Sequence, residues 1–137
     1  MSFVLDNSVA LAWCFEDEQS PPIMALLDRV VATGAMAPLL WPLEALNGLL
    51  VAERRRRLDP HKRAELAGLL RALPITLDDE TAEKSWEATL RLAERFTLSV
   101  YGAAYLELAQ RRRLPLACKD RALRNAAAAL GVEVLLA

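Results

Sequence analysis

Residues that bind zinc or form disulfides are scarce in this sequence. Its 137 residues include one histidine, His61, and two cysteines, Cys14 and Cys118, which are far apart and form no Cys-x-x-Cys pair. One histidine is too few for a histidine-based zinc site. We interpret the cysteines as reduced thiols, which are typical of a cytoplasmic protein.

Membrane spans, export signals and phosphate loops are also missing. No apolar run reaches the ~20 residues that cross a membrane, so we expect no membrane partner. The N-terminal "MSFVLDNS" lacks the basic start and apolar stretch of a signal peptide, which favours a cytoplasmic location. The lack of a glycine-rich phosphate loop argues against a dinucleotide-binding or P-loop protein.

No charge sign dominates the chain. Lysine and arginine number 17 and aspartate and glutamate 18, and the net charge of −1 does not indicate a nucleic-acid partner. Basic residues nevertheless cluster at Arg54–Arg57, at Arg111–Arg113 and in "KDRALR", residues 119–124. Cations are favoured near helix C-termini, so solvated helix ends explain the first two runs as well as phosphate binding does.

Hydrophobic residues make up 54% of the chain, enough for the core of a single domain over residues 1–137. Short apolar runs alternate with longer helical patterns, several of which begin near a proline, as at Pro21, Pro42 and Pro60. The expected strands cover residues 3–6, 35–40, 74–79, 114–118 and 132–136. Strands separated by helices predict a three-layer α/β/α domain with a five-stranded parallel sheet.

Two aspartates follow expected strands. Asp6 stands at the carboxyl end of the first strand, and Asp120 lies two residues past the fourth. If the strand order is 3-2-1-4-5, these strands are neighbours at the point where the order reverses, which is where open α/β sheets bind ligands. Each aspartate also precedes a helix and fits the role of an N-cap equally well.

Glu44 strengthens the case for a site. It lies in the first turn of the helix after the second strand, at the same end of the sheet, and Asn47 shares its face. The alternative is that the helix dipole simply favours an acid there. Three acids at one sheet edge indicate a hard cation such as Mg²⁺ or Mn²⁺, which takes oxygen ligands and acts on phosphodiesters.

The remaining acids have simpler explanations. We expect Asp78 and Asp79 to cap the helix that follows the third strand. We expect Glu107 to lie on the surface.

The helix that begins in "TLSVYGAAYLELA" has an unusual first turn. Ser99 stands at the N-cap and Gly102 at the third helical position, where a capping box has Glu or Gln and the dipole favours an acid. Glycine costs about 0.5–1 kcal/mol relative to alanine inside a helix. Helix rules therefore expect an acid where the chain has glycine.

Four segments together resemble a known family. They are "FVLDNSVALAW", "WPLEALNGLLVAERR", "LSVYGAAYLELAQRRRLPLACKDRAL" and "GVEVL". In order and spacing they resemble the PIN domain family, specifically the VapC-type toxins of bacterial toxin–antitoxin pairs, over nearly the whole chain.

The resemblance implies a Mg²⁺- or Mn²⁺-dependent endoribonuclease. The family's catalytic, metal-binding acids match Asp6, Glu44 and Asp120. Residues implied to orient them through hydrogen bonds are Asn7, Ser8 and Asn47. Candidate contacts to RNA phosphates are Arg54, Arg55, Arg56, Arg57, Lys119, Arg121 and Arg124. The resemblance also implies a homodimer and a VapB-like antitoxin, with no direct DNA binding by this chain alone.

Typical members read "LSVYDA" where this chain reads "LSVYGA", so Gly102 occupies the place of a further acid. The glycine is either an engineered change that protects the producing cell or a natural feature of a weakened or non-catalytic member. Two hypotheses follow: a metal-dependent ribonuclease toxin weakened in this form, and a non-catalytic PIN-fold module that binds RNA or a protein.

Overall fold

Five short parallel strands form one sheet in the computed structural model, which describes residues 2–136. The strands are β1 (Val4–Leu5), β2 (Ala35–Pro38), β3 (Ile75–Asp78), β4 (Leu116–Ala117) and β5 (Val134–Leu135). Their order is β3-β2-β1-β4-β5, with Val4 of β1 paired to Met36 of β2 and to Leu116 of β4. The predicted parallel sheet and its order are confirmed, and the strand order reverses between β1 and β4.

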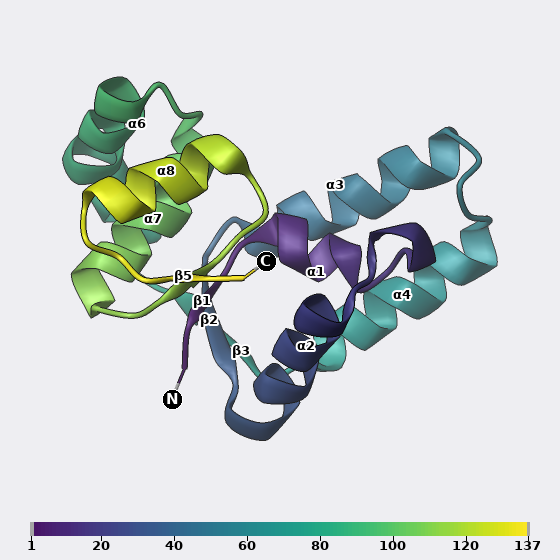
Figure 1. Cartoon of the computed structure of the whole chain (residues 1–137). Helices are drawn as coiled ribbons and strands as arrows, with labels where there is room; N and C mark the ends of the chain where they lie inside the picture. The colour runs from purple at the N-terminus through teal and green to yellow at the C-terminus, as the bar shows by residue number, and fades with distance from the viewer. Residues whose placement is uncertain (1, 137) are drawn as a thin grey trace.

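Helices cover both faces of this sheet. The first group is α1 (Asn7–Ala12), α2 (Pro21–Thr33), α3 (Trp41–Arg54) and α4 (Pro60–Ala72), with a 3₁₀ turn η1 (Glu16–Glu18). The second group is α5 (Thr81–Lys84), η2 (Ser85–Thr89), α6 (Leu90–Phe96), α7 (Val100–Arg112) and α8 (Arg121–Ala129). Figure 1 shows α1 to α4 on one side of the sheet and α6 to α8 on the other, which is the predicted three-layer arrangement.

Local signals set the helix starts. Ser20 caps α2 by accepting a hydrogen bond from the Ile23 backbone N–H, and a proline follows it directly. Asp59 caps α4 in the same way through the Lys62 N–H, at 2.7 Å, ahead of Pro60. Both starts combine a side-chain acceptor with a residue whose φ is already helical.

The segment from residue 80 to 96, which the sequence predicts as one helix, is interrupted. It divides into α5, the π-helical segment η2 and α6. The wider π turn inserts an extra residue and so rotates the following helical face. Thr89, Leu92 and Ala93 are buried, while Trp86 is 81% exposed.

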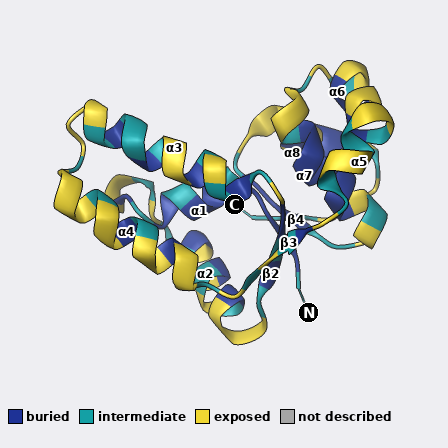
Figure 2. Ribbon diagram, turned by 180° about the vertical axis from the view of Figure 1, so that it is seen from behind, coloured by how far each residue is buried: buried dark blue, intermediate teal, exposed yellow. Residues whose placement is uncertain are grey.

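Helix α7 lies at the centre of the core. Its residues 103–109 are all buried, and the helix contacts β1, β2 and β4 (Figure 2). Three of these seven residues are alanines, which let the helix approach the sheet closely. This packing fixes the first turn of α7 relative to the strand ends. None of the helices between residues 2 and 136 is long and apolar enough to span a membrane.

Candidate active site

A pocket at the carboxyl end of the sheet brings the three candidate acids together. It has a volume of about 310 Å³, and its lining includes Asp6, Glu44, Asp120 and Gly102. The other lining residues are Thr97, Leu98, Ser99, Tyr105, Ala122 and Leu123. The acids follow β1 and β4 or open α3, so the parallel sheet, and not sequence proximity, assembles the pocket.

Asp6 is the most buried of the three acids, with 8% of its surface exposed. It caps α1 by accepting hydrogen bonds from the backbone N–H and the hydroxyl of Ser8. Burial raises the pKa of Asp6; the Ser8 hydrogen bonds oppose this, and the charges of Glu44 and Asp120 add to it. Asp6 therefore caps a helix and also lines the pocket, so the two alternatives that the sequence left open do not exclude each other.

Ser8 ties the two strand ends together. Its hydroxyl donates to Asp6 and accepts a hydrogen bond from the Lys119 backbone N–H at 3.1 Å. Asp120 follows Lys119 directly and caps α8, accepting a hydrogen bond from the Leu123 N–H at 2.7 Å. One serine hydroxyl thus joins the loop after β1 to the loop after β4.

Glu44 reaches the pocket from α3, the helix that follows β2. It lies in the first turn of α3 and is half-buried. Its Oε1 accepts a hydrogen bond of 2.6 Å from the Tyr105 hydroxyl, which comes from α7. The contact spans 61 residues of sequence and connects two helices that flank the pocket.

Gly102 occupies the third position of α7, as the sequence predicts, and its backbone N–H donates to the Ser99 hydroxyl. Its backbone has no left-handed φ. A Cβ built on it meets only the Ser99 Oγ, at 3.3 Å. The fold therefore does not require glycine at this position.

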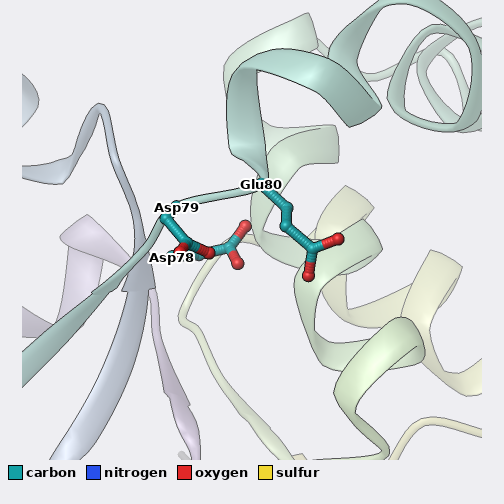
Figure 3. Close-up of side chains that lie close together, drawn as sticks. All are labelled: Asp78, Asp79 and Glu80. Atoms are coloured by element: carbon teal, nitrogen blue, oxygen red, sulfur yellow. The ribbon is translucent and has the colours of Figure 1, made fainter.

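A second group of acids lies at the end of β3 (Figure 3). Among the described residues, Asp78, Asp79 and Glu80 are the one set of three metal-ligand residues whose ligand atoms lie within 4.8 Å of one another. Arg111 binds this group: it donates to Asp78 at 2.6 and 3.2 Å and to Glu80 at 3.0 Å. Arg111 therefore compensates the negative charge of Asp78 and Glu80. This makes the group a structural ion-pair network and a poor metal site.

Two expectations about these acids change. Asp78 is held by Arg111 and Thr81, and the N-cap of α5 is Glu80, without a side-chain hydrogen bond. The prediction of a surface Glu107 is wrong: it is 6% exposed and pairs with Arg111. A buried glutamate needs such a partner, and the spacing of four residues on α7 provides it.

The pocket acids differ from this network in having no ion-pair partner in the part of the chain that the structure describes. Between residues 2 and 136, no lysine, arginine or histidine forms an ion pair with Asp6, Glu44 or Asp120. Their ligand atoms do not all lie within 4.8 Å of one another, and a cation that keeps several waters can be held by carboxylates that are farther apart. Uncompensated oxygen donors fit a hard divalent cation such as Mg²⁺ or Mn²⁺.

The PIN domain model matches residues 3–129 of the chain. The chain belongs to the PIN domain family. The resemblance read from the four sequence segments is thereby confirmed at the level of the family.

Solved structures share this PIN fold at low sequence identity. PAE2754 from Pyrobaculum aerophilum has a TM-score of 0.70 and 22% identity, over 98% of this chain and 83% of its own. FitAcB from Neisseria gonorrhoeae has a TM-score of 0.68 and 16% identity, over 98% and 96%. FitAB bound to the IR36 DNA fragment gives 0.59 and 15%, over 97% and 93%. No protein in a curated set matches this chain by sequence. Identities this low establish the shared PIN fold alone.

The other candidate residues of this PIN domain do not line the pocket. Asn7 is half-buried, and its Oδ1 has no hydrogen-bond partner among residues 2–136. Asn47 is exposed on α3. Arg57 pairs with Asp17 and Glu18 and stacks on Phe15, so its guanidinium is already engaged. Lys119 likewise pairs with Glu18, at 3.7 Å. All the basic candidates stay predictions: Arg54, Arg55, Arg56, Arg57, Lys119, Arg121 and Arg124.

Sequence reasoning missed two polar residues that line the PIN pocket, Tyr105 and Thr97. Tyr105 follows Gly102 by three residues and so shares its helical face, a spacing that was available as a signal. Thr97 ends α6 in the left-handed conformation, with φ 54° and ψ 47°, which no local residue pattern announces for a β-branched side chain.

Proposed function

We propose that this PIN domain is a Mg²⁺- or Mn²⁺-dependent endoribonuclease and the toxin of a VapBC-type toxin–antitoxin pair, weakened in this form by Gly102. The observation that carries the proposal is the pocket that Asp6, Glu44 and Asp120 all line, with no lysine, arginine or histidine among residues 2–136 paired to any of them. Family membership and the VapC-like sequence segments support it.

The three carboxylates are the metal ligands in this proposal. A divalent cation bound there supplies an activated water and stabilises negative charge on a phosphodiester. Asp6 brings the least solvated charge, and Ser8 keeps its carboxylate fixed through two hydrogen bonds. Asp120 is held at the start of α8 by its own capping bond. Asn7 and Asn47 are the further amide groups available to orient ligands and waters.

The RNA backbone is assigned to the start of α8. Arg121 and Arg124 line a shallow hollow of about 350 Å³ together with Asn125, and neither forms an ion pair within the described part of the chain. Arg121 follows Asp120 directly, so phosphates beside the cleaved bond come within reach of both guanidinium groups. Arg54 stands ten residues after Glu44 on α3, about 15 Å further along the helix axis.

The proposed function includes an antitoxin partner. A VapB-like protein would cover the acidic pocket with a basic side chain, and the toxin would form a homodimer. FitAB, a structure similar in fold, is bound to a DNA fragment. We assign DNA contacts in such a complex to the antitoxin and none to this chain, and we place its action on RNA in the cytoplasm.

A second function is favoured by Gly102. Without a fourth carboxylate, the chain would serve as a non-catalytic module that holds RNA or a protein partner. Gly102 lines the pocket, and the space around it does not require glycine. The missing carboxylate would therefore act on the chemistry of the pocket itself.

Cleavage of a labelled single-stranded RNA separates these functions. The native chain and Gly102→Asp are compared in Mg²⁺, in Mn²⁺ and in EDTA. If the chain is a weakened enzyme, its cleavage of RNA depends on the metal. The cleavage rate then rises by about 100-fold or more in Gly102→Asp, because a fourth carboxylate defines the positions of the cation and its water better. RNA binding in EDTA without cleavage by either form supports the binding module.

Two controls protect this comparison. The double variant Asp6→Asn, Gly102→Asp, purified identically, reports contaminating ribonuclease and must lose the activity. Gly68→Asp makes the same substitution on the exposed face of α4, where nothing lies within 4 Å, and must leave cleavage unchanged. Absence of both RNA binding and cleavage in every form contradicts the proposed function.

A further inference from the structure

Tyr105 places a buried hydroxyl directly against a candidate metal ligand. It is 1% exposed, and its Oη donates to Glu44 Oε1 at 2.6 Å. A phenol buried in a core needs a hydrogen-bond partner for its polar end. Glu44 is the acceptor that the structure provides.

Glu44 depends on this contact for its orientation. It carries a flexible side chain on the first turn of α3, and no protein cation in the described region pairs with it. Its Oε1 accepts from Tyr105, while its Oε2 has no hydrogen-bond donor among residues 2–136. One oxygen is therefore held by the fold, and the other is left available.

The hydroxyl is anchored more firmly than the carboxylate it binds. Helix α7 packs on β1, β2 and β4, and the phenol ring belongs to its buried face. The hydroxyl is the donor in this 2.6 Å contact, because a carboxylate oxygen accepts.

We propose that Tyr105 is a positioning residue: its hydroxyl fixes one oxygen of Glu44 so that the other is presented to a divalent cation shared with Asp6 and Asp120. This inference rests on the proposed metal site. Hydrogen-bond partners of metal ligands orient those ligands, and their loss typically lowers metal affinity by about 10–100-fold.

The test compares Tyr105→Phe with a matched control. Tyr105→Phe removes one buried oxygen and keeps the ring. Tyr101→Phe makes the same change on the same helix at a side chain that is 64% exposed and outside the pocket lining. The readout is the Mn²⁺ dissociation constant, measured by isothermal titration on the whole chain.

We expect Tyr105→Phe to weaken Mn²⁺ binding about tenfold and Tyr101→Phe to leave it unchanged. Equal Mn²⁺ affinity in Tyr105→Phe and the native chain overturns the positioning role while the metal site stands. If the native chain and Tyr101→Phe bind no Mn²⁺, the proposed metal site itself fails, and the role of Tyr105 fails with it.

A double-variant cycle separates positioning from a general effect on the core. In a Glu44→Gln background no carboxylate remains to be oriented, so adding Tyr105→Phe is expected to change the residual Mn²⁺ affinity less than twofold. This background also removes the charge of Glu44 that Tyr105→Phe would leave without its hydrogen-bond donor, which provides a folded comparison if Tyr105→Phe alone melts early. A full tenfold loss in the Glu44→Gln background overturns the proposal.

Discussion

Ser99 caps α7 by accepting a hydrogen bond from the backbone N–H of Gly102, with 3.0 Å between Oγ and nitrogen. The same hydroxyl is the atom that a Cβ added at Gly102 would approach, at 3.3 Å. A serine hydroxyl can shift by the few tenths of an ångström that this requires. An aspartate at this position is therefore compatible with the cap and adds a fourth acid to the pocket.

Gly102→Asp should change stability in a metal-dependent way. Replacing glycine and placing an acid in the first turn favours the helix by about 1 kcal/mol. Repulsion from Asp6, Glu44 and Asp120 cancels or reverses this gain when no cation is bound. In thermal melts, we expect Gly102→Asp to have a clearly higher melting temperature than the native chain in Mn²⁺, but not in EDTA. Gly68→Asp is the control, and an equal response to Mn²⁺ in the native chain and Gly102→Asp contradicts the placement of residue 102 at the metal.

Asp6→Asn should remove metal affinity and keep the fold. Asparagine is an equally good N-cap, so α1 retains its start, but an amide lacks the charge that binds the cation. Isothermal titration is expected to show Mn²⁺ binding weakened roughly tenfold or more. Asp59→Asn makes the same substitution at the N-cap of α4, away from the pocket, and should leave binding intact. Unchanged affinity in a folded Asp6→Asn protein would return Asp6 to a capping role alone.

Arg121 and Arg124 should contribute to RNA binding through phosphates. Alanine at either position is expected to weaken binding of a single-stranded RNA in EDTA and to lower the slope of log K against log salt by about 0.7. Arg54→Ala and Arg55→Ala remove exposed cations from the far end of α3 and should have smaller effects. Slopes that fall equally for both pairs would indicate a diffuse basic surface, without a phosphate track beside Asp120.

The ion pair of Asp78 with Arg111 should stabilise the fold in a pH-dependent way. Burial alone would raise the pKa of Asp78, but hydrogen bonds from Arg111 and Thr81 outweigh it and lower the pKa. A lowered pKa adds stability above the ordinary value of about 3.9, and this is lost as the pH falls through the folded-state pKa. Asp78→Asn should cost about 2 kcal/mol at pH 7.

Urea unfolding at several pH values tests this ion pair. The difference between the native chain and Asp78→Asn is expected to narrow below about pH 4. The exposed neighbour Asp79 supplies the control, because Asp79→Asn should cost little at any pH. A difference that stays constant down to pH 2 would show that the carboxylate charge is not the source of the stability.

Thr97 and Arg113 end α6 and α7 with the same left-handed backbone, φ 54° and ψ 47°. A side chain is strained in this conformation and glycine is not, so Thr97→Gly and Arg113→Gly should each raise the free energy of unfolding by about 0.5–1 kcal/mol. Urea denaturation measures both. A gain at Arg113 with a loss at Thr97 would show that the threonine makes a contact worth more than the strain it carries.

Local sequence patterns determined the helix starts and strand ends of this protein, and with them several candidate site residues. Ser20, Asp59 and Ser99 mark helix starts because a capping side chain acts on an N–H only three residues away. Asp6 and Asp120 were found because strand ends and helix starts are visible in local patterns. Gly102 stood out for the same reason, since helix position alone predicts an acid there.

Tertiary structure alone decided the partners of the long polar side chains. Tyr105 meets Glu44 across 61 residues, and Arg111 meets Asp78 across 33. Whether Glu107 is buried, and whether Asp78 is neutralised while Asp6 is not, depends on which helix packs beside each strand end. Hydrophobic periodicity fixes the face that each element buries, but it carries no information on the distant side chain that will lie opposite a given carboxylate, because that contact is set by packing of the whole sheet against α7.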